Sequence, residues 1–152
     1  MEIINIISED PASDDATMLM NELSDCLKAI TGASGKNSFN IEDMFNKRSL
    51  FVIARDSNGI AVGCGAFRSI DNTTAEIKRM YTKIKGCGIG EKIISYLEKE
   101  AYKMGYSKFI LETRLINQQA VSFYNHNGFT QIPNYGKYVH NAEAVCFEKH
   151  IF

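Results

Sequence analysis

The sequence predicts an α/β (α+β) fold, in which a central mixed, mostly antiparallel, twisted sheet of about six to seven strands carries helices on both faces. The first half of the chain contains short runs of β-branched residues joined by tight turns, which favours antiparallel pairing. The second half alternates helical and strand-like patterns, which indicates a strand–helix–strand crossover. A chain of 152 residues with 45% hydrophobic residues is typical of one globular core, so we expect a single domain over residues 1–152.

The first half predicts one strand, one long helix and three further strands. A β-branched run at residues 2–7 ends in the turn cluster at residues 8–11. Apolar side chains then recur at spacings of three and four from Ala16 to Ile30, which predicts an amphipathic helix that Gly32 stops. The remaining elements are a loop, a short helix and three strands separated by turns, at residues 33–38, 41–45, 50–55, 60–70 and 74–83.

The second half predicts a helix, a strand, a second helix and two final strands. Apolar residues at helical spacing begin at Ile89, and the helix ends at Gly105. A strand follows at residues 108–113, after which Asn117 is a good N-cap for a helix over residues 118–127. The last two strands are expected near residues 129–132 and 145–149.

The charge and cysteine content exclude several classes of protein. Lys and Arg number 17 against 18 Asp and Glu, and the net charge of -1 predicts no nucleic-acid or membrane partner. The four cysteines lack any C-x-x-C spacing, which indicates reduced thiols and a cytoplasmic protein. We expect neither a signal peptide nor a membrane span, because no basic leader and no apolar run of about 18 residues occurs. The three histidines have no spacing suited to a shared metal.

A glycine-rich turn at residues 83–92 carries the clearest chemical signal. Gly86, Gly88 and Gly90 stand between a predicted strand and a predicted helix. Glycines permit unusual backbone dihedrals, and a helix start offers unpaired N–H donors and the positive end of a dipole, so the turn is suited to phosphate. Five cations close together add local positive charge: Lys78, Arg79, Lys83, Lys85 and Lys92.

Other phosphate-binding motifs match this turn poorly. A Walker loop needs Gly-Lys-Ser or Gly-Lys-Thr, and neither occurs in the chain. A Rossmann fingerprint needs a third glycine at Glu91 or Ile93, and only Glu112 fits its acidic position. From the residues alone, two alternatives stay open: a dinucleotide-binding oxidoreductase fragment, and a tight turn with no ligand.

The turn and a later segment together resemble the GNAT superfamily of N-acetyltransferases. Residues 85–90, Lys-Gly-Cys-Gly-Ile-Gly, are similar to its acetyl-coenzyme A signature, Arg/Gln-x-x-Gly-x-Gly/Ala, with Lys85 at the position of Arg or Gln. A lysine offers a point charge there but no bidentate fork. Residues 117–129 are similar to the family's Asn-x-x-Ala-x-x-x-Tyr-x-x-x-Gly-Phe block. The resemblance covers residues 74–129, and the N-terminal half matches only in the order of its elements.

The resemblance implies that acetyl-coenzyme A (acetyl-CoA) is the co-substrate. The strand before the turn would pair its backbone with pantetheine, the turn would hold the pyrophosphate, and Asn117 would contact the pantetheine arm. Tyr124 would donate a proton to the departing thiolate, because an unperturbed pKa of about 10 keeps a tyrosine protonated at neutral pH; the alternative is an aromatic residue of the core. The implied cofactor-binding residues are Met80, Tyr81, Thr82, Lys85, Gly86, Cys87, Gly88, Ile89, Gly90, Glu91, Asn117 and Tyr124.

Direct transfer also needs a base that takes a proton from the ammonium form of the acceptor. Family members often carry a carboxylate at the start of the strand before the turn, which implies Glu76, and Glu112 on the neighbouring strand is the second candidate. Either residue is alternatively an ion-paired strand residue. By position in the family, Arg114 and the segments 37–40 and 135–138 line the acceptor cleft and suit a small amine that carries a carboxylate; the alternative is a surface arginine and two packing tyrosines.

The resemblance thus implies a cytoplasmic, acetyl-CoA-dependent N-acetyltransferase. We expect transfer of an acetyl group to the primary amine of a small molecule, or to a peptide N-terminus, by direct attack in a ternary complex. The alternative is a non-catalytic coenzyme A-binding or sensing module of the same fold. Homodimers are common in the family, so the resemblance allows a homodimer without assigning the oligomeric state.

Overall fold

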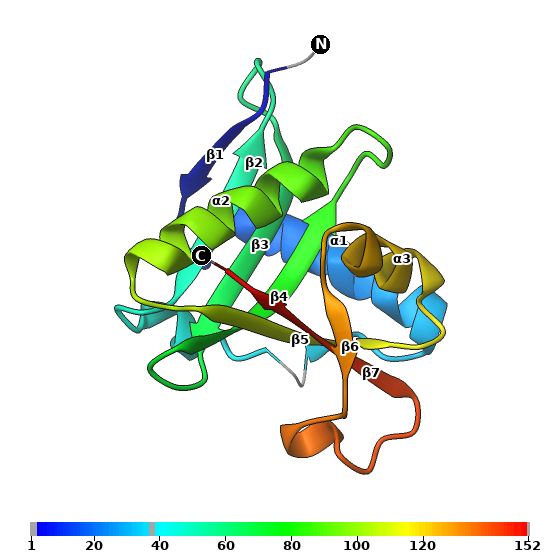
Figure 1. Cartoon of the computed structure of the whole chain (residues 1–152). Helices are drawn as coiled ribbons and strands as arrows, with labels where there is room; N and C mark the ends of the chain where they lie inside the picture. The colour runs from blue at the N-terminus through cyan, green and yellow to red at the C-terminus, as the bar shows by residue number, and fades with distance from the viewer. Residues whose placement is uncertain (1–2, 37–38, 152) are drawn as a thin grey trace.

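A seven-stranded sheet, in the order β1-β2-β3-β4-β5-β7-β6, forms the centre of the computed structural model (Figure 1). The structure describes residues 3–36 and 39–151. Its strands are β1 Asn5–Ser8, β2 Leu50–Arg55, β3 Ala61–Ser69, β4 Thr74–Thr82, β5 Lys108–Arg114, β6 Thr130–Ile132 and β7 Ala144–His150. The predicted mixed, mostly antiparallel sheet is confirmed, because among the strands of the described residues only β4 and β5 pair in parallel.

Aspartate side chains hold the two tight turns that join β2 to β3 and β3 to β4. The Asp56 carboxylate accepts hydrogen bonds from the backbone N–H groups of Asn58 (2.9 Å) and Ile60 (3.0 Å). Asp71 accepts in the same way from Thr73 (2.9 Å) and Thr74 (2.8 Å). Short turns of this kind return the chain beside itself, so β2, β3 and β4 pair antiparallel; β1 also pairs antiparallel with β2, as the sequence predicts.

Helices cover both faces of the sheet (Figure 1). Helix α1 (Asp14–Thr31) is capped by Ser13, whose hydroxyl accepts from the backbone N–H of Ala16, and is ended by Gly32 in the left-handed conformation. It packs against β3 and β4, whereas α2 (Ile89–Lys103) crosses the opposite face and contacts β2, β3 and β4. The other helical elements are α3 Gln118–His126 and the 3-10 turns η2 Ile41–Phe45 and η3 Gly136–Tyr138.

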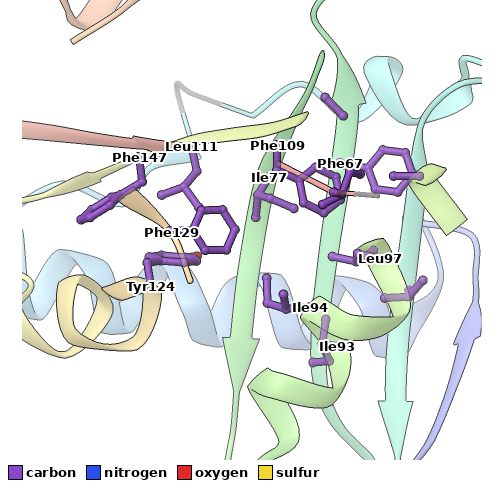
Figure 2. Close-up of a cluster of buried hydrophobic side chains, with 14 of the residues drawn as sticks. Phe67, Ile77, Ile93, Ile94, Leu97, Phe109, Leu111, Tyr124, Phe129 and Phe147 are labelled. Carbon is purple, nitrogen blue, oxygen red and sulfur yellow. The ribbon is translucent and has the colours of Figure 1, made fainter. Parts of the chain in front are cut away.

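The larger core lies between the sheet and the two helices α2 and α3 (Figure 2). Its buried side chains include Phe67, Ile77, Phe109, Leu111, Phe129 and Phe147 around the sheet, Ile93, Ile94 and Leu97 from α2, and Tyr124 from α3. A second cluster lies under α1, where Ala16 and Leu19 pack against Phe51 and Ile53 of β2. Burial of both faces explains why β2 reads as an almost continuous apolar run.

The observed elements differ from the predicted ones in three places. The first strand begins at Asn5 instead of residue 2: residues 3–4 are not in the strand, and Glu2 lies outside the described residues. The short helix at 41–45 is a 3-10 helix, and η3 falls in a segment for which the sequence predicts no element. Ile30, on the predicted apolar face of α1, is exposed. Within the described residues, no helix is both long and apolar enough to cross a membrane.

Candidate active site

A cavity of about 540 Å³ opens where β4 and β5 part. The two strands pair in parallel only at Thr74–Lys108, Ala75–Phe109 and Glu76–Ile110. Beyond this point the second halves of both strands line the cavity, together with the C-terminal half of α1, the start of α2 and the start of α3. Where the two strands separate, their facing backbone N–H and C=O groups have no strand partner. An extended ligand can lie between the strands and form hydrogen bonds with these groups.

A bulge in β4 decides which side chains face each side of this wedge. Cys64 pairs with Tyr81 and Ala66 pairs with Lys78, so two bulge residues oppose Gly65 alone. The first of them, Arg79, has a φ of 56°, which is uncommon for a residue with a Cβ. Because of this insertion, Lys78 and Arg79 lie on the same side of the sheet, although neighbouring residues of a regular strand face opposite ways; Arg79 contacts Ser24 of α1, and Lys78 contacts Tyr138.

The β3 strand accommodates the bulge through a glycine. A Cβ added at Gly65 would lie 2.6 Å from Sδ of Met80 and 2.7 Å from Cγ2 of Ile93. The absence of a side chain therefore allows Met80 to turn toward α2 at this point. Glycine inside a strand usually lowers its stability, but at position 65 the bulge requires it.

The glycine-rich turn leads from β4 into the N-terminus of α2. Gly86 and Gly88 adopt φ values of 79° and 74°, and a Cβ at either position would meet nothing within 4 Å. Gly88 is the N-cap of α2, and as a glycine it has no side chain to cap the first N–H groups of the helix. These donors, at the positive end of a 15-residue helix, face an open space that suits an anion.

The predicted concentration of cations around the turn is only partly observed. Lys85 lines the cavity, where its ammonium group donates to Oγ1 of Thr82 (3.2 Å), and burial lowers its pKa. Lys83 instead pairs with Glu22 of α1 (3.4 Å), and Lys92 is not among the cavity-lining residues. The other two cations, at positions 78 and 79, line the cavity from the α1 side. The phosphate-suited end of the cavity thus carries one lysine side chain rather than five cations.

Tyr124 and Asn117 both lie on or beside α3. The Asn117 side chain is the N-cap of α3, accepting from the backbone N–H of Ala120 (3.3 Å), and it also lines the cavity. The Tyr124 ring packs edge to face against Phe123 (5.2 Å between centroids) and Phe129 (5.3 Å), as Figure 2 shows in part. Burial raises the pKa of Tyr124, and among the described residues its hydroxyl has no hydrogen-bond partner. Tyr124 is therefore both a core aromatic residue and a neutral donor at the cavity.

The predicted cofactor-binding residues gather at this cavity, except for one. Cys87 is exposed at the tip of the turn, and it is not among the lining residues. Those that line the cavity are Met80, Tyr81, Thr82, Lys85, Gly86, Gly88, Ile89, Gly90, Glu91, Asn117 and Tyr124.

The two candidate bases occupy different surroundings. Glu76 is 1% exposed, does not line the cavity, and accepts from Nε of Arg68 (2.8 Å) and from the hydroxyl of Tyr135. Its carboxylate also lies 3.5 Å from the ammonium group of Lys78. Glu112 lines the cavity.

An arginine and burial act on Glu112 in opposite directions. The Arg114 guanidinium, on the same face of β5, donates to the Glu112 carboxylate. Burial raises the pKa of Glu112, while Arg114 and Lys78 partly oppose the rise. A carboxylate with a raised pKa has a higher proton affinity, as a base that works near neutral pH needs.

The residues predicted to line the acceptor cleft are partly brought together. Arg114 lines the cavity, whereas the segment 135–138 lies behind Glu76 and Lys78 and does not. In the segment 37–40, residues 37–38 lie outside the described residues, Phe39 lines the cavity, and Asn40 caps η2.

Sequence reasoning missed the contribution of α1. Leu27 and Ile30, near the end of the helix, line the cavity instead of the core, which explains why Ile30 is exposed. The signal is present in the sequence: the apolar face of this helix continues past the residues that the core needs. Within the described residues, no group of three or more His, Cys, Asp or Glu side chains is arranged to hold a metal ion.

Comparison with known proteins gives consistent matches over the whole fold. The model of the Acetyltransferase (GNAT) family matches residues 16–129. The "IAA acetyltransferase" of Azospirillum brasilense is 28% identical over 152 residues, covering 98% of this chain and 99% of that protein. A Klebsiella pneumoniae structure assigned to the acyl-CoA N-acyltransferases has a TM-score of 0.82 at 24% identity and covers 99% of each chain. A Thermoplasma acidophilum N-acetyltransferase in complex with coenzyme A has a TM-score of 0.71 at 20% identity, covering 97% of this chain and 99% of that one.

Proposed function

The chain belongs to the GNAT family of acetyltransferases, and on this premise we propose that it is an acetyl-CoA-dependent N-acetyltransferase of a small primary amine or a peptide N-terminus. Transfer occurs by direct attack of the amine on the bound thioester in a ternary complex. The observation that carries the proposal is the wedge between β4 and β5, which runs to the N-terminus of α2, where the N-cap residue Gly88 has no side chain to cap the first N–H groups.

Different residues of the wedge match the pyrophosphate and the pantetheine arm of acetyl-CoA. Gly86 and Gly88 leave open space over the start of α2, where backbone N–H groups and Lys85 meet the negative charge of a pyrophosphate. The second half of β4, Met80 to Thr82, offers backbone groups to the amides of a pantetheine arm. Bound acetyl-CoA supplies an activated acyl group, and a relative of this fold has been crystallised with coenzyme A.

Tyr124 is our candidate for the general acid. Its pKa is raised by burial, so the hydroxyl keeps its proton across the neutral range and has a proton to give to a leaving thiolate. Its hydroxyl has no hydrogen-bond partner among the described residues, which leaves it available for such a contact. Phe123 and Phe129 fix the ring from two sides.

Glu112 is our candidate for the base, ahead of Glu76. Glu112 lines the cavity, and its raised pKa strengthens it as a proton acceptor. Glu76 lies outside the cavity lining, and its oxygens are occupied by Arg68 and Tyr135. We therefore assign Glu76 to support of the site and Glu112 to proton removal, directly or through one water.

Calorimetric titration with acetyl-CoA tests the proposal first. We expect one saturable site for acetyl-CoA and none for NAD. Lys85→Glu reverses the charge at the phosphate end of the cavity and should weaken binding by about tenfold or more. Lys99→Glu, on the exposed side of α2 and outside this cavity, makes the same charge change and should leave affinity unaltered. A glutamate at Gly88 would be a poorer probe, because the φ of 74° strains any side chain.

Release of free thiol in the presence of a panel of amines then tests catalysis. Acetyl-CoA-dependent thiol release with an acetylated amine as product is the expected result. Binding of acetyl-CoA without transfer to any amine would favour the non-catalytic coenzyme A-binding module. Absence of acetyl-CoA binding, or competition by NAD at the same site, would contradict the proposal.

A further inference from the structure

A buried arginine without an acidic partner lies at the α1 side of the cavity. Arg79 is 9% exposed and lines the cavity. Its guanidinium donates to Oγ of Ser24 on α1 (3.2 Å) and lies over the ring of Phe39, 5.5 Å from the centroid. These contacts hold the side chain in place, but both partners are neutral.

The lack of an ion-pair partner among the described residues distinguishes Arg79 from Lys78 and Arg114, the cavity-lining cations outside the glycine-rich turn. Lys78 is paired with Glu76 and Arg114 with Glu112, whereas no described carboxylate forms an ion pair with Arg79. Burial lowers the pKa of the guanidinium, and no carboxylate contributes to offset this effect. A buried charge without a counter-charge is costly, so its retention beside an open cavity points to a ligand that supplies the missing charge.

The position of Arg79 separates it from the phosphate-suited end of the cavity. The bulge turns its side chain toward α1 and the loop at Gly35 and Phe39, and the next residue, Met80, faces α2. Lys85 and the N-terminus of α2 stand at the far end of β4, beyond Thr82. An anionic group held by Arg79 therefore belongs to the acceptor and not to the pyrophosphate.

We propose that Arg79 recognises a carboxylate of the acceptor, so that the substrate is a small amino-carboxylate rather than a plain amine. This inference rests on the proposed acetyltransferase function. A guanidinium presents its donors in a planar fork that matches the two oxygens of a carboxylate. One N–H of that fork is committed to Ser24; among the described residues the guanidinium makes no other hydrogen bond, and Arg79 lines the cavity. Leu27 and Ile30 of α1 give the same side of the cavity apolar walls that suit an apolar side chain on the acceptor.

Matched pairs of acceptors test the proposal directly. The probes are the common α-amino acids and their primary amides, which differ at the carboxyl group alone: it is a charged carboxylate in the acid and a neutral amide in its partner. For the wild-type protein we expect a carboxylate preference of about ten- to a hundredfold in kcat/KM, the effect of one charged hydrogen-bond pair. Arg79→Gln should remove the preference by raising KM for the acids, with little change for the amides, and Arg79→Lys should keep part of it.

Ser24→Ala separates recognition from a structural role. That variant removes the hydrogen bond between α1 and Arg79 but keeps the guanidinium. If Arg79 recognises the acceptor, Ser24→Ala keeps the preference for the acid over the amide. The proposal is wrong if the wild-type protein uses amides as well as acids, or if Arg79→Gln slows both members of each pair equally.

A binding measurement keeps this test independent of turnover. Equilibrium binding of the same acids and amides is measured on the protein saturated with coenzyme A. Tighter binding of the acids to wild-type protein, lost in Arg79→Gln, supports carboxylate recognition even if no amine is acetylated. If acetyl-CoA binds and amides are acetylated without any carboxylate preference, the proposed function holds and the inference about Arg79 fails.

Discussion

The ring of Phe123 lies where a side chain on Gly90 would have to stand. A Cβ added at Gly90 would lie 2.8 Å from Cε1 and 2.9 Å from Cζ of Phe123. Gly90 is in the first turn of α2 and Phe123 is in α3, so this contact sets how closely the two helices approach beside the cavity. The third glycine of the turn thus permits helix packing, whereas Gly86 and Gly88 supply left-handed backbone.

Gly90→Ala is predicted to destabilise the protein by about 1–3 kcal/mol, the usual cost of overpacking. Gly86→Ala is predicted to cost about 1–2 kcal/mol for a different reason, the left-handed φ of 79°. Urea denaturation of each variant in wild-type and Phe123→Ala backgrounds separates the two causes. The cost of Gly90→Ala should largely vanish without the Phe123 ring, while the cost of Gly86→Ala should persist; equal persistence of both would contradict the packing role.

Tyr124→Phe is predicted to lower kcat by about a hundredfold and to leave acetyl-CoA affinity unchanged, since only the proton donor is lost. Because burial raises the pKa of Tyr124, the wild-type kcat should show no loss from its ionisation as pH rises toward the ordinary tyrosine value of about 10. Pre-steady-state turnover and calorimetry measure the two effects. Tyr102→Phe, on an exposed tyrosine of α2, is the matched control. Unchanged turnover under conditions where chemistry limits would exclude Tyr124 as the acid.

The order of the elements and the glycine turn were predictable because both depend on local pattern. Spacing of apolar residues marks α1 and α2, and aspartates at 56 and 71 mark the tight turns. The bulge at Arg79 was not predictable in the same way. Strand alternation assigns Lys78 and Arg79 to opposite faces of the sheet. The local sequence contains no signal that Arg79, opposite Gly65, adopts a left-handed backbone conformation.

The surroundings of the two candidate bases also depend on distant partners. The hydroxyl that donates to Glu76 belongs to Tyr135, 59 residues later in the chain. Similarly, the cavity position of Glu112 follows from where β5 leaves β4, after three paired residues. Sequence alone identified both carboxylates as candidates, and tertiary structure is what distinguishes their burial and access.

Glu112→Gln is predicted to lower kcat by about a hundredfold and to remove the acid limb of the pH profile. The base must be deprotonated to act, so wild-type activity should rise with pH as Glu112 loses its proton. Because burial raises the pKa of Glu112, this limb should lie above the ordinary glutamate value of about 4.3. Arg114→Gln should move the limb to still higher pH, since Arg114 lowers that pKa. Retention of the limb in Glu112→Gln would exclude Glu112 as the group responsible.

Glu76→Ala is predicted to destabilise the fold by about 3–5 kcal/mol, because it leaves the largely buried ammonium group of Lys78 without its counter-charge. Arg68 lies 2.8 Å and Lys78 3.5 Å from the Glu76 carboxylate, and the Tyr135 hydroxyl loses its acceptor as well. Urea denaturation measures the loss, with Glu143→Ala, an exposed glutamate, expected to change stability by no more than about 0.5 kcal/mol.

The Glu76→Gln variant separates support of the fold from proton removal. Gln keeps the shape of the side chain and one acceptor oxygen but not the charge, so we expect a smaller loss of stability than in Glu76→Ala and a pH profile with its acid limb intact. If Glu76→Gln instead folds normally and loses both the limb and turnover by about a hundredfold, Glu76 is the base. In that case proton transfer must reach a carboxylate outside the cavity lining, and the assignment of Glu112 fails.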